Sequence, residues 1–160
     1  MRPAEVLLKP GETVALEALA FDKAGRFLRK VEAKWTAKGA GQVSADGRFT
    51  AGAKAGVGAV AAQAGEAAGS ARVRVVPQLP ISEDFEAYQD GDVVGWWIGV
   101  SKGKYTIETI DGGKTLKKIA DERGPIFNRS HVFITPPLPP GYTVQADVMG
   151  GKQGRRRGDV

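Results

Sequence analysis

The sequence predicts an all-β protein, and three observations support this prediction. Apolar and polar side chains alternate with a period of two in several stretches, which is the pattern of half-buried strands. Gly-containing turns stand between these stretches, and the pair Asp46-Gly47 is typical of a tight hairpin. With 160 residues, of which 42% are hydrophobic, the chain is long and apolar enough to form a packed core.

The first strands are expected between residues 12 and 36. Alternation places Val14, Leu16, Ala18 and Ala20 on one face. A second strand is expected at residues 31–36, where Trp35 is the large inward-facing side chain. Ala, Leu, Glu and Lys also favour helices, but the flanking Pro and Gly residues and the regular alternation favour strands.

Two hairpins are expected next. The first covers residues 41–52 and turns at Asp46-Gly47. The second covers residues 57–77 and turns within residues 64–70, with Val73 and Val75 on one face. Short strands at this spacing predict a β-sandwich.

These stretches also carry a resemblance to a known family. In order, "KPGETVALEALAFDKAG", "VEAKWTAKG", "VSADGRFTAGAKAGVGAVAAQAG" and "ARVRVV" resemble a bacterial immunoglobulin-like domain of the group 2 type. The resemblance covers about residues 4–76 and implies an immunoglobulin-like β-sandwich over residues 1–76. Ala59, Ala61 and Ala62 stand where the family has Val or Ile, which is a departure from its pattern.

A second domain is expected at residues 81–160, after a Pro-rich linker at residues 77–80. The sequence predicts a hairpin around the turn "DGG" and a further strand in "GYTVQADVM". The motifs "DFE", "GKY" and "YTVQADV" resemble the start of a concanavalin-like or jelly-roll sandwich. A jelly roll needs about 8 strands, and fewer are recognisable, so the prediction is a partial, truncated jelly-roll-like β-sandwich in a fragment of a longer chain.

Together, the two segments resemble the C-terminal region of bacterial proteins that carry a β-propeller repeat of the pyrroloquinoline-quinone type. Those proteins are exported, so the resemblance implies a periplasmic, outer-membrane-associated or secreted parent protein, with a β-propeller among the neighbouring domains as partners. No propeller repeat is recognisable, and no cofactor is carried over. The chain shows neither a signal peptide nor an apolar run of the roughly 20 residues that span a bilayer.

Two groups of side chains are candidate binding residues. Trp96, Trp97 and Tyr105 are candidates for an aromatic platform that stacks on a polysaccharide, with core packing as the alternative. Glu83, Asp84 and Glu86 are candidate ligands for calcium, which binds carboxylate and carbonyl oxygens. The alternative for the carboxylates is a solvated strand end with Phe85 in the core.

Catalysis is not expected from this sequence. His131 is the only histidine, and no nucleophile motif accompanies it. Cysteine is absent, which excludes disulfides and cysteine-based metal sites. The net charge of +5 is spread along the chain, and the basic residues 155–157 lack a nucleic-acid-binding motif, so no nucleic acid partner is expected.

We therefore expect a non-catalytic accessory, spacer or interaction region of an exported multidomain bacterial protein. The first alternative is a carbohydrate-binding module with a Trp platform and a structural calcium ion. The second alternative is a fragment of a glycoside hydrolase-type enzyme, which would need a carboxylate pair across a cleft.

Overall fold

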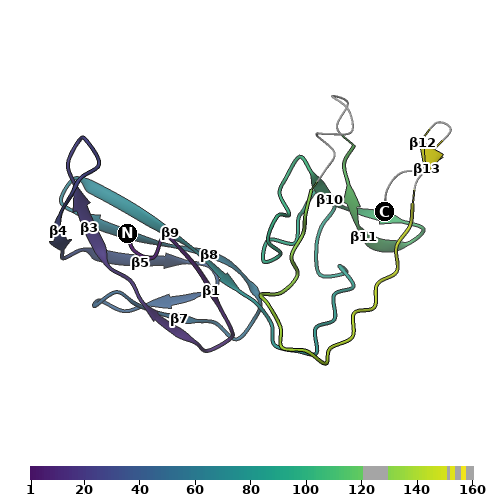
Figure 1. Cartoon of the computed structure of the whole chain (residues 1–160), viewed down its shortest axis with the longest axis horizontal. Coiled ribbons are helices and arrows are strands. Elements are labelled where there is room, and N and C mark those ends of the chain that lie inside the picture. Colours follow the sequence, from purple (N-terminus) through teal and green to yellow (C-terminus); the bar gives the residue numbers. More distant parts are fainter. Residues whose placement is uncertain (121–129, 151, 154–155, 158–160) are drawn as a thin grey trace.

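The computed structural model describes residues 1–120, 130–150, 152–153 and 156–157. This part of the chain forms strands, turns and extended segments with no helix, so the protein is all-β, as predicted. Figure 1 shows two lobes, one formed by the purple-to-teal residues and the other by the green-to-yellow residues. In the basic cluster at residues 155–157, residue 155 lies outside the described residues, and Arg156 and Arg157 are described by their backbone alone.

The largest sheet of the first lobe has four strands. In spatial order these are β1 (Glu5–Leu8), β9 (Ala67–Val75), β8 (Gly56–Ala64) and β5 (Lys34–Lys38). β1 runs parallel to β9, and the other neighbours are antiparallel. β8 and β9 form the long hairpin that was predicted for residues 57–77, and the turn lies at Gly65 and Glu66.

Two smaller sheets complete the first lobe. One contains β2 (Thr13–Ala15), β7 (Arg48–Ala51) and β6 (Gly41–Val43), in that spatial order. The other pairs β3 (Ala18–Phe21) with β4 (Phe27–Val31). The antiparallel pairing of β6 with β7 confirms the hairpin predicted around Asp46-Gly47.

A single hydrophobic core lies between the sheets of the first lobe. Its fully buried residues include Phe49 from β7, Val60 from β8, and Val73 and Val75 from β9. Each Val side chain buried in this way stabilises the fold by about 1.5–3 kcal/mol relative to exposure. Because strands of two different sheets supply this core, the arrangement is compatible with a β-sandwich.

The turn between β6 and β7 requires glycine at its last position. Gly47 has a φ of +82°, a conformation that side chains disfavour. A Cβ atom at Gly47 would also lie 2.8 Å from the ring of Trp35. The backbone of the turn therefore packs directly on the indole of Trp35.

The prediction of one continuous strand at residues 31–36 is wrong, because these residues belong to two different strands. β4 ends at Val31 and pairs with β3, whereas β5 begins at Lys34 and pairs with β8. The chain thus leaves one sheet and enters another across Glu32 and Ala33. Apolar and polar residues alternate without interruption from β4 to β5, because each of the two strands has one face toward the interior. The alternation alone therefore could not show that the chain changes sheets.

The second lobe contains one well-formed hairpin. β10 (Tyr105–Ile110) pairs antiparallel with β11 (Gly113–Lys118), which confirms the hairpin predicted around "DGG". Asp111 and Gly112 both have positive φ angles, of 50° and 87°, as a two-residue type I′ turn requires. The backbone also forms two short paired segments, β12 (Lys152–Gln153) and β13 (Arg156–Arg157).

The strand predicted in "GYTVQADVM" is absent from the structure. Residues 141–150 are extended and exposed, and no strand lies beside them among the described residues. A strand is stabilised by backbone hydrogen bonds to a neighbour and by burial of one face. Here the alternating sequence has neither, although Figure 1 shows the segment running along the outside of the second lobe.

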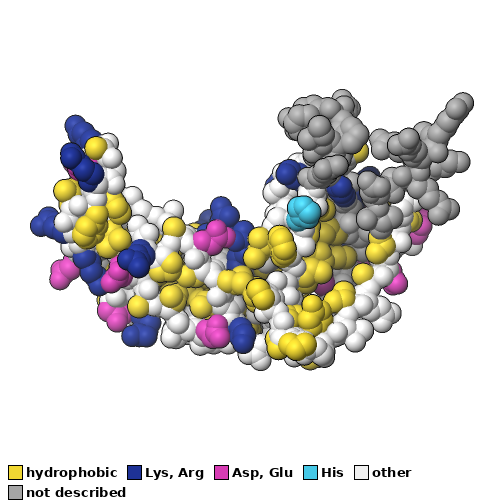
Figure 2. Space-filling model, viewed as in Figure 1, with side chains coloured by type: hydrophobic (Ala, Val, Ile, Leu, Met, Phe, Trp, Pro, Cys, Tyr) yellow, Lys and Arg dark blue, Asp and Glu magenta, His cyan; other side chains and the backbone are white. Residues whose placement is uncertain are grey.

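The two lobes meet through apolar contacts near the predicted linker. Val75 is buried in the core of the first lobe, and the next residue, Val76, is buried in that of the second. Ala55, from the loop before β8, also packs against the second core. Figure 2 shows apolar side chains continuing across the junction.

Candidate functional site

Aromatic side chains gather in the second lobe on the segment that precedes β10. The rings of Trp96 and Trp97 meet edge to face, with centroids 5.8 Å apart and planes at 86°. Phe85 meets Trp97 in the same manner, at 5.8 Å and 71°. The two tryptophans lie in a turn, in which the Trp97 amide donates a hydrogen bond to the Val94 carbonyl over 3.2 Å.

Only one of the three candidate platform residues has an appreciably accessible side chain. Trp96 is 5% exposed and belongs to the second core, together with Val94 and Ile107. Tyr105 is 8% exposed, and its hydroxyl is hydrogen-bonded to the Ser130 hydroxyl at 2.6 Å. Trp97 is half-buried against the same core. Polysaccharide binding stays a prediction, and Trp97 is the residue through which it would have to act.

The indole N–H of Trp97 is not accessible as a hydrogen-bond donor to a ligand on such a platform. Its nitrogen is buried and has no hydrogen-bond partner among the described residues. A ligand that stacks on the ring would therefore rely on the apolar face, since the nitrogen is not reached by solvent.

The three candidate calcium ligands point to different partners. Glu83 accepts a hydrogen bond from the Phe85 amide at 3.1 Å, and Asp84 accepts one from the Glu86 amide at 3.1 Å. Glu86 accepts a 2.8 Å bond from the amide of Lys114 in β11. No group of three or more His, Asp or Glu side chains in the described ranges could hold a metal ion. Calcium binding by these residues stays a prediction.

Glu83 also influences its aromatic neighbour. The Tyr88 hydroxyl donates a hydrogen bond to Glu83 over 3.4 Å. Burial raises the pKa of Tyr88, and the negative charge of Glu83 raises it further. The phenol therefore remains neutral and serves as a hydrogen-bond donor that orients Glu83.

A second polar cluster was not predicted from the sequence. Asp90 accepts hydrogen bonds from the Thr109 hydroxyl at 3.0 Å and from the Lys114 ammonium at 2.5 Å. The Lys114 hydrogen bond is the largest cause that lowers the pKa of Asp90, followed by that of Thr109. This cluster ties the loop before β10 to both strands of the hairpin, and nothing in the turn-like sequence "QDGD" indicates those distant partners.

His131 is exposed and lies beside a short backbone bridge. Ile98 and Phe133 exchange two backbone hydrogen bonds of 3.0 and 2.9 Å. A Cβ atom at Gly99 would collide with the His131 carbonyl oxygen. The structure therefore assigns the backbone of His131 a packing role.

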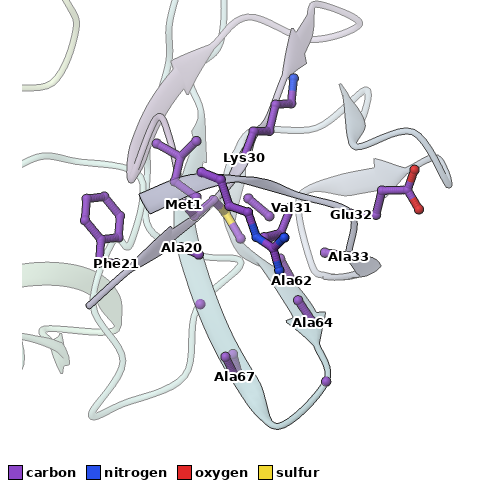
Figure 3. A pocket seen from close by; sticks show the side chains of 16 residues that line it. Met1, Ala20, Phe21, Lys30, Val31, Glu32, Ala33, Ala62, Ala64 and Ala67 are labelled. Carbon is purple, nitrogen blue, oxygen red and sulfur yellow. The ribbon is translucent and has the colours of Figure 1, made fainter. Parts of the chain in front are cut away.

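A groove lies in the first lobe, away from all the candidate residues. It has a volume of about 750 Å³ and separates the β3–β4 hairpin from the end of the β8–β9 hairpin. Figure 3 shows Ala side chains along it; those at positions 20, 33, 62, 64 and 67 are all among the lining residues. Small side chains leave the space between the hairpins unfilled. The run of Ala in β8 was the signal in the sequence for this loose packing.

Among the described residues, no helix is long and apolar enough to cross a membrane. A scan of the chain against protein-family models finds no match, and a search among curated proteins finds none either.

Proposed function

We propose that this chain is a non-catalytic spacer and interaction region of an exported multidomain bacterial protein. Its task is to hold neighbouring domains at a defined separation and orientation. The observation that carries the proposal is the coupling between the two lobes at Val75 and Val76.

These two residues point in opposite directions because successive side chains of an extended strand alternate. Val75 is fully buried in the first core, and Val76 is 3% exposed in the second. The Val76 amide also donates a 2.8 Å hydrogen bond to the Leu8 carbonyl, at the end of β1. One lobe cannot rotate about this point without exposing one of the two valines.

A second contact limits rotation at the junction. A Cβ atom at Gly95 would lie 3.1 Å from a methyl group of Val57 in β8. The glycine thus lets the second lobe approach the outer surface of β8 closely. Together with the two prolines of the 77–80 segment, which stiffen the connection, these contacts favour one mutual orientation.

The resemblances in the sequence support the rest of the proposal. The first lobe, in which strands of different sheets enclose one core, is proposed to be an immunoglobulin-like domain. The assignment of the second lobe to a jelly-roll-like sandwich, and the exported location, depend on the sequence resemblance alone.

Spin-label distance measurements test the spacer function directly. The chain has no cysteine, so labels can be attached at Glu66→Cys in the first lobe and Lys118→Cys in the second. We expect a single narrow distance distribution. The matched experiment adds Val76→Ala, which should broaden the distribution. A broad distribution in the parent protein would show that the lobes move independently and would contradict the proposal.

A further inference from the structure

The extended segment 142–149 has the side-chain pattern of a strand but no partner. Tyr142, Val144 and Val148 lie on one side by alternation, and their exposed fractions are 54%, 71% and 64%. Within the described residues, the backbone of 142–149 makes no hydrogen bond. Unpaired backbone groups and exposed apolar side chains make such a segment ready to pair with a sheet edge.

β4 provides a sheet edge with the complementary properties. It is paired with β3 on one side, and no described strand lies on its other side. Its apolar residues Phe27 and Leu28 are 58% and 60% exposed, and Arg29 and Lys30 follow them. Apolar and basic side chains therefore line an open edge.

We propose that residues 142–149 of one copy add as a strand to β4 of a second copy. The charges favour one register, because Asp147 is the acidic residue of the segment and Lys30 lies on the accessible edge strand. The Lys30 ammonium already pairs with Glu17 at 2.8 Å, but its side chain is 65% exposed and has further N–H donors for a second carboxylate. With Asp147 opposite Lys30, Val148 and Ala146 fall on the face of β4 that carries Arg29 and Val31. This match of faces holds for either direction of the added strand.

The added strand would also extend an existing apolar surface. Val31 lines the groove of the first lobe, and its cross-strand partner in β3 is the buried Ala18. A Val or Ala side chain placed opposite Val31 therefore contacts apolar atoms. Cross-strand pairs of this kind, together with an opposite-charge pair, are the units that stabilise a sheet.

Direct pairing of β4 with a second β4 is less favourable. An antiparallel pair centred on the middle residue would place Arg29 opposite Arg29, and like charges in that position are destabilising. Figure 2 shows Lys and Arg side chains gathered at this end of the first lobe. Figure 1 shows β4 and the segment before β12 at opposite ends of the molecule. The association therefore joins two different surfaces of the molecule, and such contacts produce open chains unless the rotation between copies closes them into a ring or pair.

Sedimentation of the full chain over a series of concentrations tests association. We expect average mass to rise with concentration. Val148→Pro should weaken association at least tenfold, because residue 148 faces β4 in either direction of the added strand and proline removes a ladder donor. It should leave the thermal midpoint unchanged, because Val148 is 64% exposed and its backbone makes no hydrogen bond within the described residues. Asp147→Lys should weaken association about fivefold, whereas the control Glu66→Lys, with the same change in net charge at an exposed hairpin turn, should not. A monomer at every concentration, or equal effects of the two Lys variants, would overturn the proposal.

Cross-linking then identifies the two surfaces. Leu28→Cys protein is mixed with Met149→Cys or Gln145→Cys protein of different tag length and treated with a short bis-maleimide. A Leu28–Met149 product supports antiparallel addition, and a Leu28–Gln145 product supports parallel addition. Products that join only Leu28 to Leu28, or no product, would overturn the proposal.

Discussion

The two lobes are held together by different kinds of interaction. In the first lobe, nine strands pair in three sheets, and interior valines with Phe49 fill the space between them. In the second lobe, one hairpin carries most of the regular pairing, and a long loop is fastened to it by side chains. The first lobe is therefore stabilised mainly by sheet and core, whereas the second depends on aromatic contacts and on carboxylates that accept hydrogen bonds.

The largest expected effect comes from the core of the first lobe. Phe49→Ala removes a fully buried ring that contacts both sheets, and we expect a loss of about 3–5 kcal/mol in unfolding free energy. Ile107→Ala is the matched change in the second lobe, with an expected loss of about 2–5 kcal/mol. Urea denaturation, followed by tryptophan fluorescence, measures both. A loss below about 1 kcal/mol for Phe49→Ala would show that the sheets do not share the core described above.

The coupling of the lobes gives the next largest effect. Val76→Ala removes two methyl groups from the second core, and we expect a loss of about 2 kcal/mol. If the lobes unfold as one unit, the wild-type protein should show a single urea transition and the variant two. Val6→Ala is the control, because this half-buried valine packs on the first core alone. A single transition in the variant would mean that coupling does not depend on Val76.

The sequence predicted the paired parts of the fold well and the unpaired parts poorly. Period-two alternation and Gly-containing turns, with Asp-Gly in β6–β7 and β10–β11 and Gly65-Glu66 in β8–β9, were sufficient for these three hairpins because each forms between neighbours in the sequence. The sheet change at Glu32 and Ala33 was missed because alternation carries no information about which strand is the partner. The predicted strand at 141–149 failed for the same reason.

The candidate sites were harder to predict than the fold. Aromatic residues next to one another suggested an exposed platform, yet burial of Trp96 and Tyr105 is decided by packing between segments distant in sequence. Adjacent acidic residues suggested a metal site, yet the direction of each carboxylate depends on which amide lies nearby. Composition indicated the kinds of side chain present, whereas their partners emerged only from the three-dimensional arrangement.

Alanine substitutions at two turn glycines of the first lobe, Gly47 and Gly65, should have smaller effects on stability. Gly47→Ala introduces a methyl group at positive φ and against the ring of Trp35, so we expect a loss of about 2–3 kcal/mol. Gly65→Ala, in the turn of β8–β9, meets only the conformational cost of about 1 kcal/mol, because nothing lies within 4 Å of its added Cβ. Thermal unfolding of both variants provides the comparison. Equal losses would mean that Trp35 does not pack on the turn.

The smallest expected effect is the pH dependence of stability that arises from the contacts of Asp90 with the β10–β11 hairpin. The pKa of Asp90 is lowered in the folded protein, first by the Lys114 hydrogen bond and then by that of Thr109. A lowered folded pKa means that this carboxylate stabilises the fold above its unfolded pKa of about 3.9 and that the contribution disappears as pH falls through the lower folded value. Asp90→Asn should therefore reduce the thermal midpoint slightly at neutral pH, and the difference from the parent protein should vanish in strong acid. Since Asp90 is exposed to solvent, added salt should also reduce the difference in thermal midpoint.

Asp111→Asn, which changes a carboxylate in the hairpin turn, is the control. A midpoint difference for Asp90→Asn that stays constant from neutral to acidic pH would show that the charge of Asp90 does not fasten the loop to the hairpin.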